Sequence, residues 1–216
     1  KILVFIFGIA VFFRFFRLFD FQYWSVDEEI FTAVVRQVAV NHKLILISPN
    51  VAIAVSLGSF FHLLSAPIFL LTNFVASKIL VAGSLLGVIT ALAVYKTGKE
   101  IGGLFVGRAG AFLYSASFLM AFSDRRFWPL TPDPLLAVLS IFAVAKIIKG
   151  KYGYALLLAI CASFAWHSDP SLAVIIIFSL FSVVVFKLPL FKKDYPPALI
   201  YLLFSITPFF AFELRH

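Results

Sequence analysis

Residues 76–95 read ASKILVAGSLLGVITALAVY, an apolar run in which Lys78 is the single charged residue. About 20 such residues are enough for a helix to cross the roughly 30 Å hydrocarbon core of a bilayer. The whole chain has the same character, since 62% of its 216 residues are hydrophobic and 13% are charged. A water-soluble domain has about a quarter charged residues. The composition therefore excludes disordered, coiled-coil and nucleic-acid-binding proteins, and it predicts an all-α, polytopic membrane helix bundle.

Similar apolar runs indicate about seven transmembrane helices in a single domain that covers residues 1–216. We expect these helices at 2–19, 76–95, 104–122, 133–148, 152–167, 170–186 and 196–212. The segment 20–75 is different, and we interpret it as the first outer loop. Its apolar half, 51–71, is predicted to form interfacial or re-entrant juxtamembrane helices. If 51–71 crossed the membrane, the basic clusters at 96–108 and 146–151 would lie outside, against the positive-inside rule.

The formal net charge of +8 is informative once it is placed on this topology. With a cytoplasmic N-terminus, the cytoplasmic side carries ten basic and two acidic residues, and the outer side carries eight of each. Cytoplasmic loops of membrane proteins are expected to carry such an excess of Lys and Arg. The excess therefore orients the chain and does not identify a ligand. The balanced outer face is where we expect the functional site.

The first candidate site lies in the outer loop at Ser25-Val-Asp-Glu28, which has the pattern of a helix capping box. We expect an amphipathic surface helix over 26–41, with Asp27 and Glu28 at its positively polarised N-terminus. These acids either cap the helix or form part of a site, and the sequence leaves both readings open.

The second candidate site is the short outer loop 124–133, which reads DRRFWPLTPD. The planar guanidinium group of Arg125 or Arg126 can donate two hydrogen bonds to a phosphate. Asp133 either lines the same cavity or caps the following helix. The arginines could equally anchor the loop at lipid headgroups.

Four further features carry weaker signals. His167 lies in a tight outer turn, 166–170, that either lines a cavity or is an ordinary turn. Arg14 and Arg17 either extend to the headgroups, which we favour, or face a lipid phosphate. The single cysteine, Cys161, excludes a disulfide framework and a cysteine-built metal site. Two GxxxG patterns, at 83–87 and 103–107, indicate close helix packing.

Several short motifs follow one another along the chain. They are Arg17-Leu18, 26–29 with Arg36 further along that helix, 46–49, 57–67, 99–108, 126–133 and 212–216. Their order and topology resemble the GT-C class of membrane glycosyltransferases, and more closely the group similar to dolichyl-phosphate-mannose-protein mannosyltransferases. The chain departs from that group at 58–62, which reads GSFFH where the family often has Gly-Pro and tyrosines.

The resemblance implies an enzyme of the prokaryotic inner membrane that transfers a sugar from a polyprenyl-phosphate donor. The acceptor would be a glycan, lipid or protein at the extracytoplasmic face. It implies that the catalytic carboxylate is Asp27, with Glu28 beside it, acting as a general base on the acceptor hydroxyl while arginines neutralise the leaving phosphate. The residues expected to bind substrate and phosphate are Asp133, Arg126, Arg125, Arg36, Arg17 and His167. A divalent cation, Mg²⁺ or Mn²⁺, on Asp27 and Asp133 is left open, and the chain is expected to be the N-terminal half of a longer enzyme.

The alternative function is a transporter or flippase for a lipid-linked or anionic solute. That class places charged residues inside its spans near the bilayer midplane. Here the expected spans are almost free of charge, which favours chemistry at the membrane surface. A non-catalytic assembly subunit also remains open.

Overall fold

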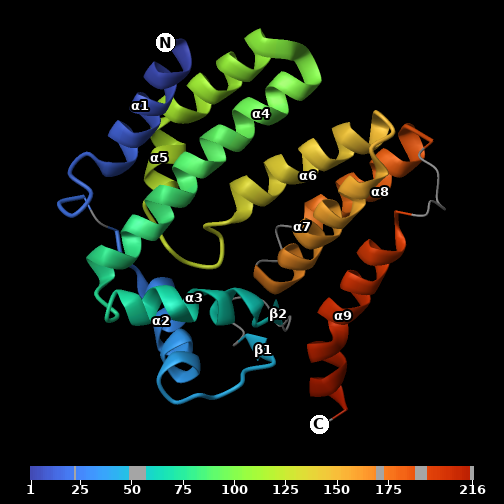
Figure 1. The fold of residues 1–216 in the computed structure, drawn as a ribbon. Coiled ribbons are helices and arrows are strands. Elements are labelled where there is room, and N and C mark those ends of the chain that lie inside the picture. The colour runs from blue at the N-terminus through green and yellow to red at the C-terminus, as the bar shows by residue number, and fades with distance from the viewer. Residues whose placement is uncertain (22, 49–56, 169–172, 188–193, 215–216) are drawn as a thin grey trace. The chain divides into compact units, whose positions relative to one another are not determined.

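The computed structural model describes residues 1–21, 23–48, 57–168, 173–187 and 194–214, which are mostly helical (Figure 1). This confirms the all-α prediction. The strands in the described residues are two short ones, β1 (Ile47–Ser48) and β2 (Leu57–Gly58), which pair antiparallel. The chain divides into two compact units, one of residues 1–43 and 62–138 and the other of residues 44–61 and 139–216. That both belong to one transmembrane domain stays a prediction.

The first unit is built around a helix that doubles back on itself. It contains α1 (Ile2–Phe15), α2 (Val26–Ala39), most of α3 (Phe60–Leu71), α4 (Ala76–Ala116), α5 (Phe118–Asp124) and the first turns of α6 (Asp133–Ile148). Helix α4 reverses direction at Gly102 and Gly103, and Gly103 has the positive φ of 79° that favours glycine. Figure 1 shows the two arms of α4 side by side, with α1 packed along them.

Small residues let the two arms of α4 touch. A Cβ atom added to Gly98 would lie 2.9 Å from the Cα atom of Gly107, so neither position accepts a larger side chain without movement. Two of the expected helices, 76–95 and 104–122, are therefore found as the two arms of α4. The second arm ends at Ala116, and α5 then begins at Phe118.

The capping box predicted at Ser25 is confirmed. The Ser25 backbone N–H donates to Oε2 of Glu28 over 2.9 Å, and α2 begins at Val26. The helix ends at Ala39, two residues before the predicted end at 41. Its buried face carries Phe31, whose ring lies 4.9 Å from the ring of His62 in α3.

The second unit contains the rest of α6, a 3₁₀ turn η1 (Tyr152–Tyr154), α7 (Ala155–Ser168), α8 (Ala173–Val185) and α9 (Pro196–Glu213). Helix α7 packs against α8 and α9, and it also contacts β2. The approach of β2 to α7 is close, because a Cβ atom on Gly58 would lie 1.6 Å from Nδ1 of His167. Only glycine fits at this crossing.

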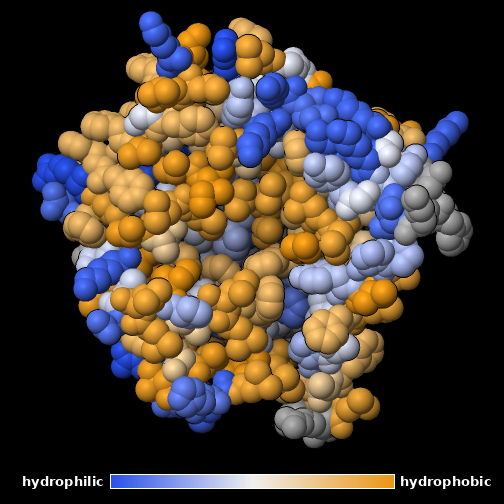
Figure 2. Space-filling view, in the orientation of Figure 1, coloured by the Kyte–Doolittle hydropathy of each residue, from blue (hydrophilic) through white to orange (hydrophobic). Residues whose placement is uncertain are grey.

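Within the described residues, one helix, α4, is long and apolar enough to cross a membrane. Shorter apolar helices of 10–17 residues occur at Ile2–Phe15, Phe60–Leu71, Tyr152–Phe164, Val174–Val185 and Pro196–Phe212. Figure 2 shows that much of the visible surface is hydrophobic, which agrees with the many large apolar side chains that are exposed. The predicted seven-span bundle stays a prediction. Residues 51–56 of the expected interfacial segment and 170–172 of one expected span lie outside the described residues.

Candidate functional site

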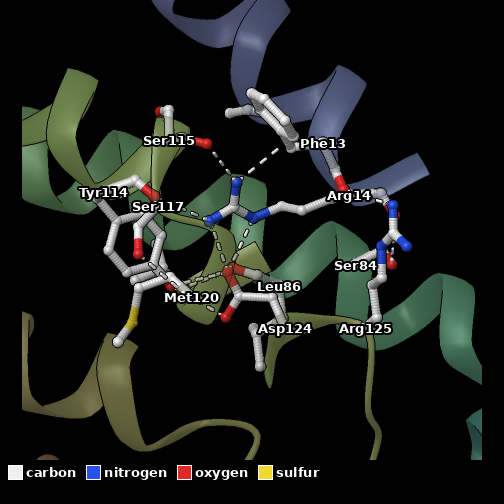
Figure 3. A network of polar contacts seen from close by, with 12 residues as sticks. Phe13, Arg14, Ser84, Leu86, Tyr114, Ser115, Ser117, Met120, Asp124 and Arg125 are labelled. Atoms are coloured by element: carbon white, nitrogen blue, oxygen red, sulfur yellow. Dashed lines mark hydrogen bonds and ion pairs between the residues drawn. The ribbon is translucent and has the colours of Figure 1, made fainter. Parts of the chain in front are cut away.

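The centre of the first unit is a buried ion pair between α1 and α5 (Figure 3). The Arg14 Nε atom donates to Oδ2 of Asp124 over 2.8 Å, and Nη2 lies 2.7 Å from the same oxygen. The exposed fraction of the side chain is 0% for Arg14 and 4% for Asp124. The Tyr114 hydroxyl lies 3.0 Å from both carboxylate oxygens and donates to Asp124.

The rest of the Arg14 guanidinium group is also hydrogen-bonded. Nη1 donates to the carbonyl oxygens of Ala10 and Ser115, over 3.3 and 3.4 Å, and Nη2 donates to that of Tyr114 over 3.5 Å. A buried charge pair is tolerated only when its remaining donors find such partners. The prediction that Arg14 extends to headgroups is therefore wrong, because Arg14 points into the helix bundle and Asp124 neutralises it.

The first GxxxG pattern makes room for this network. A Cβ atom on Gly87 would lie 2.5 Å from Cγ of Asp124 and 2.6 Å from Nε of Arg14. A Cβ atom on Gly83 would lie 2.0 Å from the carbonyl oxygen of Arg126. Because Gly83 and Gly87 have no side chains, Arg14, Asp124 and the backbone of Arg126 can lie directly against α4.

The next residue, Arg125, binds the end of α1. Its Nη2 atom donates to the carbonyl oxygens of Phe13 and Phe16, over 2.6 and 2.8 Å. The last carbonyl groups of a helix have no partner within the helix, and a cation there also meets the negative end of the helix dipole. Arg125 thus ties the loop 124–133 to α1, and this role was not predicted from the sequence.

Arg126 connects the same loop to the start of α2. Its Nε atom donates to Oε1 of Glu28 over 2.5 Å, and its guanidinium carbon lies 3.7 Å from the centre of the Trp128 ring and 5.0 Å from that of Tyr23. Aromatic faces attract a guanidinium cation in this arrangement. Arg126 is therefore held by a carboxylate and two rings at once.

Glu28 is fully buried and both of its carboxylate oxygens have donors. Oε1 accepts from Arg126, and Oε2 accepts from the backbone N–H and the hydroxyl of Ser25. Burial by itself would raise the pKa of Glu28, but the hydrogen bonds from Arg126 and Ser25 outweigh it and lower the pKa below its usual value. Glu28 is thus an ionised structural acid, whereas Asp27, one residue earlier on the first turn of α2, is partly exposed.

The remaining predicted site residues lie in separate surroundings. Arg17 is exposed and donates to Asp20 over 2.8 Å, and Arg36 is exposed with its guanidinium carbon 4.7 Å from the centre of the Phe74 ring. Asp133 is the first residue of α6 and is half-buried. His167 is buried in the second unit, with Nε2 2.9 Å from the carbonyl oxygen of Ser205.

The structure thus brings Arg126 to Glu28 at the start of α2. It places Arg125 at the end of α1 and gives Arg17 and Arg36 other partners. Across the part of the chain that the structure describes, no group of three or more His, Cys, Asp or Glu side chains could hold a metal ion. The divalent cation that was left open on Asp27 and Asp133 stays a prediction, because Mg²⁺ is commonly held by one or two carboxylates together with water, and we derive no step through it.

Comparison of the chain with models of protein families, with curated proteins and with solved structures gives no match. Chemically, the arrangement offers a partly exposed carboxylate, Asp27, on the first turn of α2, and an arginine, Arg126, bound to Glu28 on the same turn.

Proposed function

We propose that the chain is part of a membrane-embedded glycosyltransferase of the GT-C kind. It would transfer a sugar from a polyprenyl-phosphate donor to a glycan, lipid or protein acceptor at the extracytoplasmic face of a prokaryotic inner membrane. The expected arrangement is a bundle of about seven spans with a cytoplasmic N-terminus. The apolar helices and the many exposed hydrophobic side chains support a location in the bilayer.

The observation that carries the proposal is the division of roles between Asp27 and Glu28. A general base must be ionised and must reach the proton that it removes. Glu28 is ionised but buried, and its oxygens already accept from Arg126 and Ser25. Asp27 is partly exposed on the same helical turn, where the helix dipole stabilises a carboxylate. We therefore assign the base to Asp27 and a positioning role to Glu28.

In the proposed reaction, Asp27 accepts the proton of the acceptor hydroxyl. The hydroxyl oxygen then forms a bond to the anomeric carbon of the sugar, and the bond from that carbon to the phosphate oxygen breaks. The polyprenyl phosphate leaves with the electron pair. The charge of Arg126, which is shared with Glu28, would stabilise the negative charge that builds up on the phosphate, whereas Arg125 binds the end of α1.

The experiment replaces Asp27 with Asn in the complete natural protein and measures sugar transfer from a polyprenyl-phosphate sugar in membranes. Loss of a general base lowers the rate by about 10²–10⁴-fold. Glu29→Gln is the matched control, because Glu29 is an exposed acid on the same turn and has no assigned role. A folded Asp27→Asn protein with the full transfer rate contradicts the assignment.

The transporter or flippase remains the second candidate, and the Arg14–Asp124 pair is the observation that favours it. Ionised side chains buried between apolar helices often mark a path for a solute or ion. Movement of a lipid-linked sugar across vesicles by the purified protein, without sugar transfer, would reverse the ranking.

A further inference from the structure

Trp128 stacks on the arginine that the proposed reaction uses. The guanidinium carbon of Arg126 lies 3.7 Å from the centre of the Trp128 ring, compared with 5.0 Å for the Tyr23 ring. The shorter distance means direct contact, because carbon atoms that touch are about 3.5–4.0 Å apart. Tryptophan is also the aromatic residue that attracts a cation most strongly. Trp128 is therefore the principal aromatic partner of Arg126.

This stacking leaves the edges of the guanidinium group free for hydrogen bonds. The N–H bonds of an arginine lie in the guanidinium plane, so a ring against its face occupies none of them. Nε donates to Oε1 of Glu28, and Nη2 donates to Oγ of Ser25 over 3.4 Å. Among the residues that the structure describes, Nη1 of Arg126 has no hydrogen-bond partner, and 16% of the side chain is exposed. One edge of Arg126 is thus available for an anion.

The loop itself holds Trp128 close to the backbone of Arg126. The Trp128 N–H donates to Oγ1 of Thr131 over 2.8 Å, and the Thr131 hydroxyl donates to the carbonyl oxygen of Arg126 over 3.3 Å. The Thr131 N–H donates back to the carbonyl oxygen of Trp128 over 2.9 Å. Pro129 also restricts the backbone of Trp128, because the residue before a proline is largely limited to extended conformations. Trp128 therefore has little freedom to move away from Arg126.

The neighbouring Phe127 anchors this loop in the core of the first unit. Its side chain is buried, and its ring centre lies 6.3 Å from that of Phe31 in α2 and 6.0 Å from that of Phe69 in α3. Phe31 follows Glu28 by three positions on α2, so the anchor and the ion pair act on the same part of that helix. The packed core therefore fixes Trp128 relative to the start of α2.

We propose that Trp128 is a positioning residue for the phosphate of the lipid-linked donor. Glu28 fixes one edge of the Arg126 guanidinium group and Trp128 fixes its plane, and these two constraints together set the direction of the Nη1 edge. A hydrogen-bond donor that is already oriented needs no reorganisation when charge develops on the phosphate. In this role Trp128 acts through Arg126. The inference rests on the phosphate site in the proposed function, but not on Asp27 as the base.

The first measurement is ligand binding, which needs no sugar transfer. The complete natural protein, purified in detergent, is titrated with farnesyl phosphate and with farnesol, which lacks the phosphate, and binding is measured by native mass spectrometry. Trp128→Leu should weaken the binding of farnesyl phosphate about tenfold, which is the weight of one hydrogen bond to a charged group, and should not change that of farnesol. Trp128→Phe keeps an aromatic face and should stay within about threefold of the natural protein. Phe112→Leu is the matched control, because it removes a ring of 42% exposure from the second arm of α4.

A double variant shows whether Trp128 acts through Arg126. Arg126→Lys keeps the positive charge but loses the planar group that stacks and donates at the same time. In the Arg126→Lys protein, Trp128→Leu should weaken farnesyl phosphate binding by no more than about a further twofold, whereas independent residues would give the full factor again. Thr131→Val is a milder variant should Trp128→Leu not fold, because it removes only the hydroxyl that closes the loop. It should weaken farnesyl phosphate binding about threefold.

The proposal is overturned if farnesyl phosphate binds no better than farnesol, if Trp128→Leu and Phe112→Leu have equal effects, or if the effects of Trp128→Leu and Arg126→Lys multiply. These outcomes are separate from those for sugar transfer. A protein that needs Trp128 to bind farnesyl phosphate but transfers no sugar would contradict the proposed enzyme and leave the role of Trp128 intact. Transfer that is lost in Asp27→Asn but unchanged in Trp128→Leu would contradict the role of Trp128 and leave the enzyme intact.

Discussion

Replacing Asp124 with Asn tests the structural centre of the first unit. The substitution keeps the shape of the side chain and a partner for Tyr114, but it leaves the charge of Arg14 buried without a counterion. Breaking a buried ion pair from one side costs about 3–5 kcal/mol. Because an amide can still accept hydrogen bonds, we expect the lower end, about 3 kcal/mol. For a chain of this size that corresponds to a fall in Tm of about 10 °C.

The assay is thermal unfolding of the detergent-solubilised protein, followed by the fraction that remains monodisperse on size-exclusion chromatography. The matched control is Asp20→Asn, because Asp20 pairs with Arg17 at the surface, with exposed fractions of 58% and 57%. Exposed pairs contribute about 0–1 kcal/mol, so the control should shift Tm by no more than about 3 °C.

A double variant separates the pair from its surroundings. Arg14→Met removes the other charge, so Arg14→Met combined with Asp124→Asn should lose less stability than the two single variants added together, by about 0.5–3 kcal/mol. If Asp124→Asn and Asp20→Asn shift Tm equally, or if the single effects simply add, Arg14 and Asp124 do not form the buried pair described here.

Two other substitutions test contacts in the first unit. Gly87→Ala should lower stability by about 1–3 kcal/mol, because its methyl group would lie 2.5 Å from the Asp124 carboxylate; Gly8→Ala, with nothing within 4 Å of the added carbon, should be neutral or stabilising in the same thermal assay. Burial lowers the pKa of His62 to about 4 from 6.5, so the unfolded chain binds the proton more tightly. The stabilisation from neutral His62 should therefore be complete above about pH 6.5 and decrease as the pH drops towards 4. Tm measured against pH should be flatter in that window for His62→Phe. An unchanged profile in His62→Phe would show that His62 is not the responsible group.

Features set by neighbouring residues were predictable from the sequence. The Ser25 capping box depends on residues three positions apart, and the start of α2 was placed correctly for that reason. The two arms of α4 were predicted as separate helices from their apolar length. Their reversal at Gly102 and Gly103 was not predicted, because Gly103 was interpreted as part of a helix-packing pattern.

Features set by contacts between distant segments were not predictable in the same way. Arg14 and Asp124 are 110 positions apart, so the sequence did not show that each is the other's partner. The available signals were Arg14 inside an apolar run and Asp124 at the start of an outer loop, and we placed both at the membrane surface. The ion pair between Arg126 and Glu28 joins residues 98 positions apart, and it was not predicted for the same reason.

In the structure, the two arginines of the phosphate site predicted from the sequence already have partners within the protein. Arg125 and Arg126 do lie in one loop near Glu28, but their side chains already bind α1 and α2. His167 belongs to the second unit, where β2 and α9 surround it. Residue type alone could not distinguish arginines that hold helices together from arginines that are free to bind a ligand.

Direct measurement of sugar transfer tests the central claim most sharply. Membranes that contain the complete natural protein are given, at the extracytoplasmic face, a polyprenyl-phosphate donor with a radiolabelled sugar, or a nucleotide sugar with the same label. We expect label to pass to an acceptor from the lipid-linked donor, and not from the nucleotide sugar. Label that crosses the membrane while still attached to its lipid carrier, with no transfer to any acceptor, would contradict the proposed glycosyltransferase.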